Sequence, residues 1–344
     1  MRRPIILLLL AALSTIGAGG VDVASLARQG AQVAAARDAG RQWLGAPERI
    51  ADGVDLFRVD GFHLGGADVP QSIRLLRLDP RRVRMASALA TDDIPGRARV
   101  LDIAREAGAL AAVNAGFFSP PGEPVGLLRV NGRLVSDTRR LRGAVALLED
   151  ANGAALRFGQ AGARVTLHFR VGQRWRAMPI DGVDTVRGRG QLVLFTPASG
   201  PTTDTTGGRE WVVGQERGAN GQPVWRVSPP SAAGNSAIPR DGYVLSRSGD
   251  VVPAALTSLS RATAVRVEET ILVHGQARTA DWQRAAAIIG GAGLLVQNGR
   301  PLTDWTRERL SKGFDVTRHP RTVIARDRTG AVWLITIDGR QPGR

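Results

Sequence analysis

The chain has 344 residues, a formal net charge of +15 and no cysteine. Without cysteine, disulfides, thiol catalysis, cysteine-ligated zinc and iron–sulfur clusters are excluded. The charge first suggests nucleic acid or another anionic surface, but Lys312 is the only lysine and the other basic residues are scattered arginines. A nucleic-acid binder needs clustered basic residues with interleaved aromatics, and only 5% of the residues are aromatic. We therefore expect no nucleic-acid partner.

The N-terminus has the order of a secretory signal peptide. Arg2 and Arg3 precede an apolar run over residues 5–13, and small residues follow at 17–20. The run is too short to span a bilayer comfortably, so a retained membrane anchor is the weaker interpretation. We expect a signal peptide over residues 1–19 and a mature chain that begins between residues 18 and 25. The mature protein would be secreted or periplasmic, with no stable membrane span.

The rest of the chain predicts a lead-in followed by one domain. Residues 20–50 are rich in alanine and predict a helical or flexible lead-in without chemistry of its own. The domain is expected over residues 51–344. It begins with strands at 54–59 and 73–78, where apolar and polar residues alternate, and continues with one amphipathic helix at 97–107 that Gly108 ends.

Strands and hairpins dominate the remainder of the domain. A buried strand at 109–113 should deliver Asn114, and the proline-rich loop 119–124 predicts no regular structure. Asn131-Gly132 between apolar runs predicts a hairpin, and Asn298-Gly299 repeats the pattern in register. The repeat is explained either by common turn chemistry or by two related halves of one domain. A last hairpin joins 322–325 to 332–337. The pattern indicates an α+β fold with strand-rich mixed or antiparallel sheets and a few packing helices.

Three short segments carry residues that packing alone does not explain. Asn114-Ala-Gly-Phe-Phe118 ends a predicted strand, Arg318-His-Pro-Arg-Thr322 offers donors suited to phosphate, and Asp338-Gly-Arg340 places a carboxylate after an apolar strand. Each has a plainer interpretation, since Asn and Asp-Gly also make turns and most arginines of this chain are surface residues.

Several other kinds of site are not supported by the sequence. The glycine-rich stretches lack the spacing of phosphate-binding or dinucleotide-binding loops, and no Gly-x-Ser-x-Gly motif is present. The four histidines have no paired ligand spacing, which argues against a histidine-based zinc site. We expect no defined cofactor, although the sequence leaves room for a divalent cation.

Taken in order, five segments resemble the phosphodiester glycosidase family, which includes the animal enzyme that removes N-acetylglucosamine from mannose 6-phosphate. The resemblance covers roughly residues 50–344. The segments that carry it are residues 112–118, 238–246, 289–296 with Asn298-Gly299, 319–322 and 337–340.

The resemblance implies a hydrolase, a glycosidase that cleaves a sugar-1-phosphodiester in a glycan or cell-envelope polymer. Such a site needs donors on the phosphate and a carboxylate near the anomeric carbon. By this resemblance, three residues take catalytic roles: Asp338 as the carboxylate, Arg321 on the phosphate and Asn114 orienting substrate. The residues expected to bind substrate are Thr322, Arg340, Gly116 and Gly339.

The resemblance also implies a difference. Members of the family continue past Asp-Gly-Arg into a helix and an Asn-Leu-Asp-Gly-Gly-Gly-Ser segment, whereas this sequence stops at Arg344. The domain is therefore expected to be incomplete at its C-terminus, either as a truncated sequence or as a protein that has lost part of its site. The alternative function is a noncatalytic protein of the same fold that binds extracellular polysaccharide.

Overall fold

The computed structural model describes residues 5–9, 44–63, 70–91, 94–138, 140–150, 153–217, 220–249, 251–275 and 279–339. The expected cleavage region and most of the alanine-rich lead-in lie outside these ranges. Within them the fold is α+β and mostly β, as the sequence predicts, with two short α-helices. Neither helix is long and apolar enough to cross a membrane.

The helices are α2 (Val100–Glu106) and α3 (Thr279–Arg284). The strands of the N-terminal half are β1 (Ile5–Leu9), β2 (Glu48–Ala51), β3 (Val54–His63), β4 (Pro70–Leu78), β5 (Arg84–Ala88), β6 (Ala111–Asn114), β7 (Phe117–Phe118), β8 (Pro124–Val125), β9 (Leu128–Val130), β10 (Arg133–Ser136), β11 (Arg142–Asp150) and β12 (Gly153–Val171). Those of the C-terminal half are β13 (Arg174–Ile180), β14 (Gly182–Val183), β15 (Leu192–Phe195), β16 (Arg209–Arg217), β17 (Pro223–Val227), β18 (Tyr243–Arg247), β19 (Ala264–Val273), β20 (Ala287–Gly290), β21 (Val296–Gln297), β22 (Arg300–Pro301), β23 (Arg321–Arg326) and β24 (Val332–Ile337).

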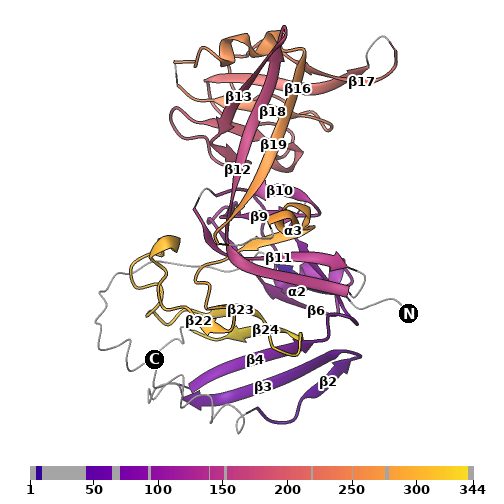
Figure 1. Ribbon diagram of the computed structural model, residues 1–344, viewed down its shortest axis with the longest axis vertical. Helices are drawn as coiled ribbons and strands as arrows, with labels where there is room; N and C mark the ends of the chain where they lie inside the picture. The colour runs from indigo at the N-terminus through magenta and orange to yellow at the C-terminus, as the bar shows by residue number, and fades with distance from the viewer. Residues whose placement is uncertain are drawn as a thin grey trace.

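The molecule has two lobes joined by the long strands β12 and β19 (Figure 1). The upper lobe is formed by the upper parts of β12 and β19 and by the strands between them in the sequence. In it, β13, β12 and β19 lie side by side, and a five-stranded sheet of order β14-β15-β18-β16-β17 packs against them. Alternate residues of β12 face this core, which buries Leu167 and Phe169 with Trp211 and Leu245. The period of two along the strand therefore produces one buried and one open face.

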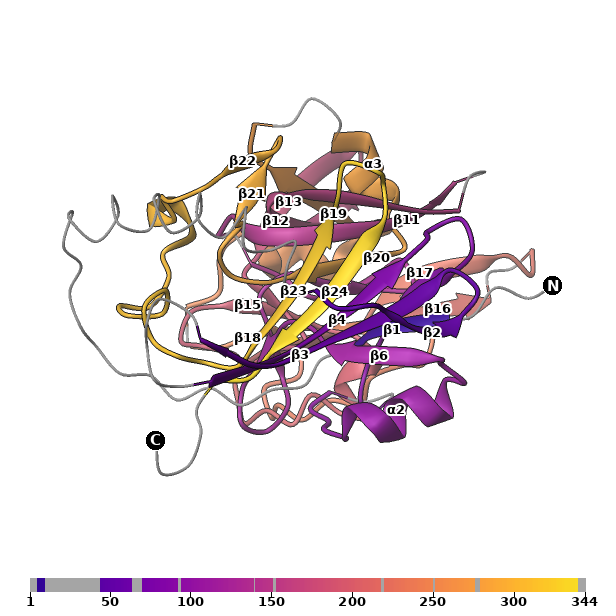
Figure 2. The same ribbon diagram turned by 90° about the horizontal axis from the view of Figure 1, so that it is seen from below.

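The lower lobe stacks three sheets. The strands β10-β9-β20-β11-β12 continue the sheet of the upper lobe downward, and an antiparallel sheet of order β2-β3-β4-β24-β23 covers the bottom (Figure 2). Between them lies a second core that buries Leu78, Val145, Val332 and Leu334. Residues 48–50 of β2 fall within the expected lead-in, so the last part of the lead-in is a strand of this sheet rather than a helix.

The third sheet contains a segment that the sequence assigns to the signal peptide. In the order β5-β1-β6, β1 pairs in parallel with a neighbour on each side, Ile6 opposite Met85 and Ala111. The helix α2 buries Ile103 in a small cluster with alanines of β5 and β6. Residues 5–9 thus form the central strand of this sheet. Their apolar character fits a central strand as well as it fits a signal peptide.

The hairpin turns follow the predicted chemistry. Asn131 and Asn298 both have positive φ, 50° and 52°, as does the glycine after each, and both turns join paired strands. The first hairpin belongs to the long sheet, whereas the second forms a separate two-stranded ribbon. The two copies therefore share turn chemistry and are not equivalent halves. The loop 119–124 was predicted to be irregular, but its last residue, Pro124, pairs with Phe118.

The turn between β23 and β24 is organised by one carboxylate. Asp327 Oδ1 accepts hydrogen bonds from the backbone nitrogens of Thr329 (2.8 Å) and Ala331 (3.1 Å), and Oδ2 accepts one from Trp333 Nε1 (2.9 Å). Burial alone would raise the pKa of Asp327, but these hydrogen bonds outweigh it and hold the pKa below its ordinary value. The ionised form therefore stabilises the hairpin that carries the predicted site residues.

Candidate active site

The candidate site begins where β6 ends. Asn114 is the last residue of β6 and is half-buried. Because β5, β1 and β6 are parallel, the loops that follow β5 and β6 leave the sheet at the same edge, where ligands bind in many open sheets. A small depression between these loops is lined by residues including Leu89, Ile94, Gly122 and Pro124, and none of the predicted site residues is among those that line it.

A side-chain hydrogen bond joins Asn114 to the C-terminal hairpin. Thr322 Oγ1 donates to Asn114 Oδ1 at 2.5 Å, across 208 positions of sequence. Thr322 lies opposite Thr336 in the β23–β24 ladder, on the face whose neighbours Ile324 and Leu334 pack into the lower core. The inner face of this sheet therefore brings two of the predicted site residues into contact.

Arg321 is held beside them, but by a different set of contacts. Its position next to Thr322 in the strand turns it toward the opposite face. Its guanidinium lies over the ring of Phe314, with Cζ 4.5 Å from the centroid, and Nη2 donates to the carbonyl oxygens of Phe314 (2.5 Å) and Thr317 (3.1 Å). Burial lowers the pKa of Arg321, an effect that nearby Asp315 opposes, yet an arginine keeps its charge at neutral pH.

Aromatic contacts connect Arg321 with the segment after Asn114. The ring of Phe314 meets Phe117 edge-on, with centroids 6.1 Å apart, and the ring of His319 lies at the same distance. Phe117 belongs to the first of the three predicted segments and His319 to the second. Arg321, Phe314 and Phe117 thus form a continuous chain of contacts from the hairpin to the loop after β6.

Asp338 closes the sheet at the end of β24. Its Oδ1 accepts a hydrogen bond from Ser72 N at 2.7 Å, and its own backbone nitrogen donates to Ser72 O at 3.0 Å. With its amide in the orientation that satisfies its partners, Gln71 donates to Asp338 O (3.1 Å) and accepts from Arg318 Nη2 (2.7 Å). One carboxylate oxygen therefore fixes β4 to β24, and Arg318 lies close to this carboxyl segment.

Gly339 has a packing role that the sequence does not predict. A Cβ atom on it would lie 2.0 Å from Pro320 N and 2.2 Å from His319 C. The chain's own backbone fills the space on this side of Gly339, so the missing side chain serves packing. Substrate binding by Gly339 stays a prediction. Gly116 is buried in the loop after β6, and Arg340 lies outside the described residues.

A buried carboxylate that sequence reasoning missed organises another family segment. Glu308 has no exposed surface. Its Oε2 accepts from the backbone nitrogens of Gly143 (2.8 Å) and Gly293 (2.9 Å), and its Oε1 accepts from Leu294 N (2.9 Å) and Gln160 Nε2 (3.1 Å). Glu308 thus ties residues 289–296 to β11 and β12. A lone acid within a polar loop gives no sequence signal for such a role.

The structure describes no group of three or more His, Asp or Glu side chains that could hold a metal ion. The predicted site residues instead offer an arginine, an amide, a hydroxyl and a carboxylate. Of these, the structure shows the amide of Asn114 and the hydroxyl of Thr322 in direct contact. That donor set suits an anionic substrate, with Arg321 as its cation.

The comparisons with known proteins agree with the resemblance of the motifs. Residues 214–344 match the family model described as phosphodiester glycosidase. The matched part contains Arg321, Thr322 and Asp338, and it supports the resemblance to this family. No curated protein matches the chain.

Two solved structures share the fold. A hypothetical protein from Synechocystis is 22% identical, with a TM-score of 0.63 over 83% of this chain. A protein from Burkholderia pseudomallei that is described as exported is 21% identical, with a TM-score of 0.59 over 79% of this chain. The chain spans 51% and 62% of the lengths of these two proteins. At these identities the likeness concerns the fold alone.

Proposed function

We propose that the protein is a hydrolase that cleaves the bond between the anomeric carbon of a sugar and a phosphodiester. The observation that carries the proposal is the contact of Thr322 with Asn114, which brings two family segments together. Arg321, the neighbour of Thr322 in β23, adds a cation that is held over Phe314 by contacts that restrict its motion.

This reaction needs little proton donation from a general acid. The leaving group is a phosphate monoester, which needs less protonation than a sugar alkoxide. Arg321 would bind the phosphate and stabilise the charge that develops on it, since a guanidinium offers paired donors. Asp338 would act as base, or stabilise positive charge on the ring, with its orientation fixed by Ser72. Asn114 and Arg340 would orient the sugar.

One observation favours the alternative, a noncatalytic protein that binds polysaccharide. Asp338 and Gly339 both take part in packing at the sheet edge. A protein that had lost its chemistry would retain these contacts for stability. The two functions differ in one measurable respect, because only the hydrolase turns over substrate.

The test is hydrolysis of an N-acetylglucosamine 1-phosphodiester in ¹⁸O-labelled water, followed by ³¹P NMR. We expect a phosphate monoester without ¹⁸O, because attack at the anomeric carbon leaves the label on the sugar. Label in the phosphate would mean cleavage of a P–O bond and would contradict the proposal. Absence of turnover would favour the binding protein.

Two variants with matched controls test the residues. Asp338→Asn should lower kcat far more than it weakens binding, whereas Arg321→Lys should raise KM and lower kcat. Asp52→Asn, in the exposed turn between β2 and β3, and Arg326→Lys, exposed on the same strand as Arg321, should leave both constants unchanged. If Asp338→Asn leaves kcat unchanged, Asp338 is structural.

We also propose export to the periplasm or the medium, on the strength of Arg2, Arg3 and the apolar run. Retention of the N-terminus also has a physical basis, because residues 5–9 pair with β5 and β6 in the folded chain. N-terminal sequencing separates the two. A first residue between 18 and 25 supports export, and Met1 on a cytoplasmic product rejects it.

A further inference from the structure

The upper lobe has an open sheet face that the proposed chemistry does not use. Along β12, Val165, Leu167 and Phe169 point into the core, so the residues between them point the other way. The registers of β12 with β13 and β19 assign the members of this open face. They are Arg164, Thr166, His168 and Arg170 of β12, Trp175, Ala177 and Pro179 of β13, and Ala264, Arg266, Glu268 and Thr270 of β19.

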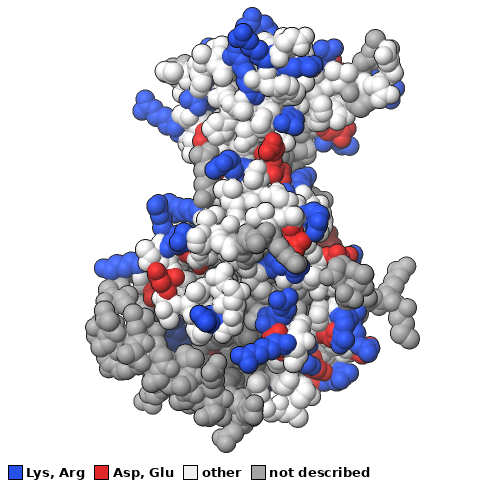
Figure 3. All heavy atoms as spheres, in the orientation of Figure 1, with Lys and Arg blue, Asp and Glu red and all other residues white. Residues whose placement is uncertain are grey.

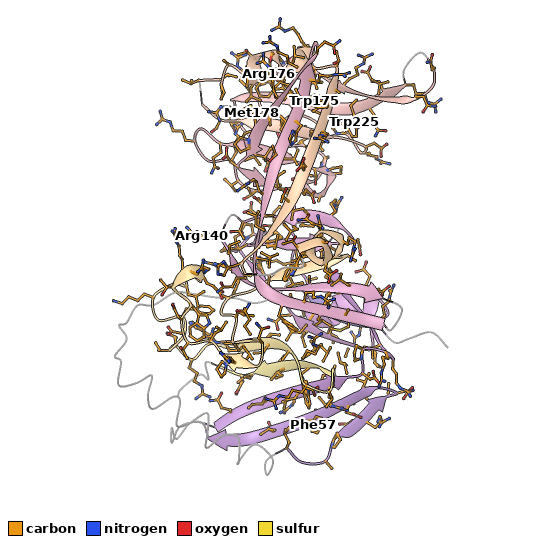
Figure 4. The ribbon with its side chains drawn as sticks, in the orientation of Figure 1. Phe57, Arg140, Trp175, Arg176, Met178 and Trp225 are labelled. Atoms are coloured by element: carbon orange, nitrogen blue, oxygen red, sulfur yellow. The ribbon has the colours of Figure 1, made fainter. Side chains whose placement is uncertain are left out.

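Trp175 is the conspicuous residue of this face. It leaves 52% of its surface exposed, in the upper lobe (Figure 4). Arg170 lies directly opposite it in the ladder. The guanidinium carbons of Arg170 and Arg266 lie 5.9 Å and 5.5 Å from the ring centroid. A single exposed aromatic residue is common on protein surfaces, but this ring lies between two guanidinium groups, which hold it by cation–π contacts. The arrangement offers a ligand a flat apolar surface and two cations at one place.

The charge of the face is positive. Arg164, Arg170 and Arg266 stand against one acid, Glu268, which lies 3.2 Å from His168 Nε2 and 3.8 Å from Arg266 Nη2. Arginine side chains gather at this end of the molecule (Figure 3). Two small side chains lie near this cluster: Ala177 is two residues after Trp175 on β13, and Ala264 lies opposite Arg170 on β19. Three strands and four alternate positions make a platform about 10 Å wide and about 20 Å long.

We propose that this open face binds an anionic glycan, with the Trp175 ring stacked on a sugar ring and Arg170 and Arg266 bound to its phosphate or carboxylate groups. This proposal rests on the proposed function, because the open face would hold the polymer that carries the scissile bond. Charge complementarity and the single aromatic platform favour a glycan. A single-stranded nucleic acid stacks successive bases on several aromatic side chains, and this face has one.

The test is affinity electrophoresis of the full chain carrying Asp338→Asn in native gels that contain alginate, neutral dextran or single-stranded poly(dT). We expect retardation by alginate and none by dextran. Trp175→Ala should weaken alginate binding about fivefold or more, as expected for loss of an aromatic contact, and Trp175→Phe should restore most of it. Arg170→Gln with Arg266→Gln should weaken it about tenfold or more.

Controls separate this face from the bulk charge of the protein. Arg105→Gln with Arg328→Gln removes the same charge from exposed positions of the lower lobe and should change binding less than about twofold. Equal losses in both double variants, or full binding by Trp175→Ala, would overturn the proposal. Tighter binding of poly(dT) than of alginate would overturn it in favour of nucleic acid.

Hydrolysis of a small soluble diester distinguishes this proposal from the proposed function. Trp175→Ala in the otherwise unaltered chain should hydrolyse it at the normal rate, because the face does not contact the reacting atoms. A chain that binds alginate through Trp175 but hydrolyses no diester would leave this inference standing and reject the hydrolase. A chain that hydrolyses the diester and binds no alginate would support the hydrolase and reject this inference.

Discussion

Replacing Glu308 by glutamine tests whether a buried carboxylate holds the family segment 289–296 in place. The change keeps the size of the side chain and converts one acceptor oxygen into an NH2 group. Whichever oxygen is lost, two N–H groups then face another donor, because each oxygen accepts two hydrogen bonds. Two hydrogen bonds to a charged group are worth together about 3–6 kcal/mol. Relief of the buried charge offsets part of this, so we expect a loss of at least about 2 kcal/mol.

The assay is urea unfolding followed by tryptophan fluorescence and by circular dichroism. Trp305 reports on the same site, since its Nε1 donates to Leu294 O at 3.0 Å. The control is Glu106→Gln, an exposed acid of α2, which should change the free energy of unfolding by less than about 0.5 kcal/mol. If Glu308→Gln behaves like this control, the four hydrogen bonds do not contribute as their geometry implies, and the reasoning is refuted.

Three further perturbations probe other parts of the fold. The pKa of Asp327 is lowered in the folded state. Its contribution to the free energy of unfolding is therefore fully present above the unfolded pKa of about 3.9 and is lost as the pH falls through the folded pKa. Asp327→Asn should flatten the acid limb of a pH–stability curve, and an unchanged limb would contradict this. Gly339→Ala should destabilise by more than about 2 kcal/mol, since its Cβ would overlap the backbone at Pro320, while Gly214→Ala, with its nearest neighbour at 3.7 Å, should be tolerated; equal unfolding midpoints would refute the clash. Deletion of residues 1–20 should lower the urea midpoint, because two strand edges lose their partner, and a midpoint equal to that of the full chain would show β1 to be dispensable.

Local patterns accounted for much of the fold. Alternating residues and turn chemistry predicted β3, β4, β23 and β24, because each depends on neighbours in sequence. The strand β13 escaped prediction, since its residues Arg174, Trp175, Arg176 and Ala177 are all exposed and do not alternate. The open face of the upper lobe could not be seen for the same reason.

The candidate site was also predicted only in part from the sequence. The sequence placed Asn114 and Thr322 in one site, and they are in contact. It could not foresee that His319 and Pro320 fill the space above Gly339, because a close approach of two backbones leaves no mark in composition or spacing. The four donors around Glu308 come from three separate parts of the chain, which only the folded structure brings together.

Whether residues 5–9 are accessible or paired within a sheet depends on how far synthesis of the chain has gone. Ile6 pairs with Ala111, so the sheet cannot form until more than a hundred residues have been synthesised. At ordinary rates of translation this takes about 5–20 s. During that interval the N-terminus is unpaired and accessible to an export receptor; afterwards the same residues are held between two strands. If the protein is exported as proposed, a receptor that acts on the nascent chain meets residues 5–9 unpaired, whereas one that acts after folding meets them paired on both sides.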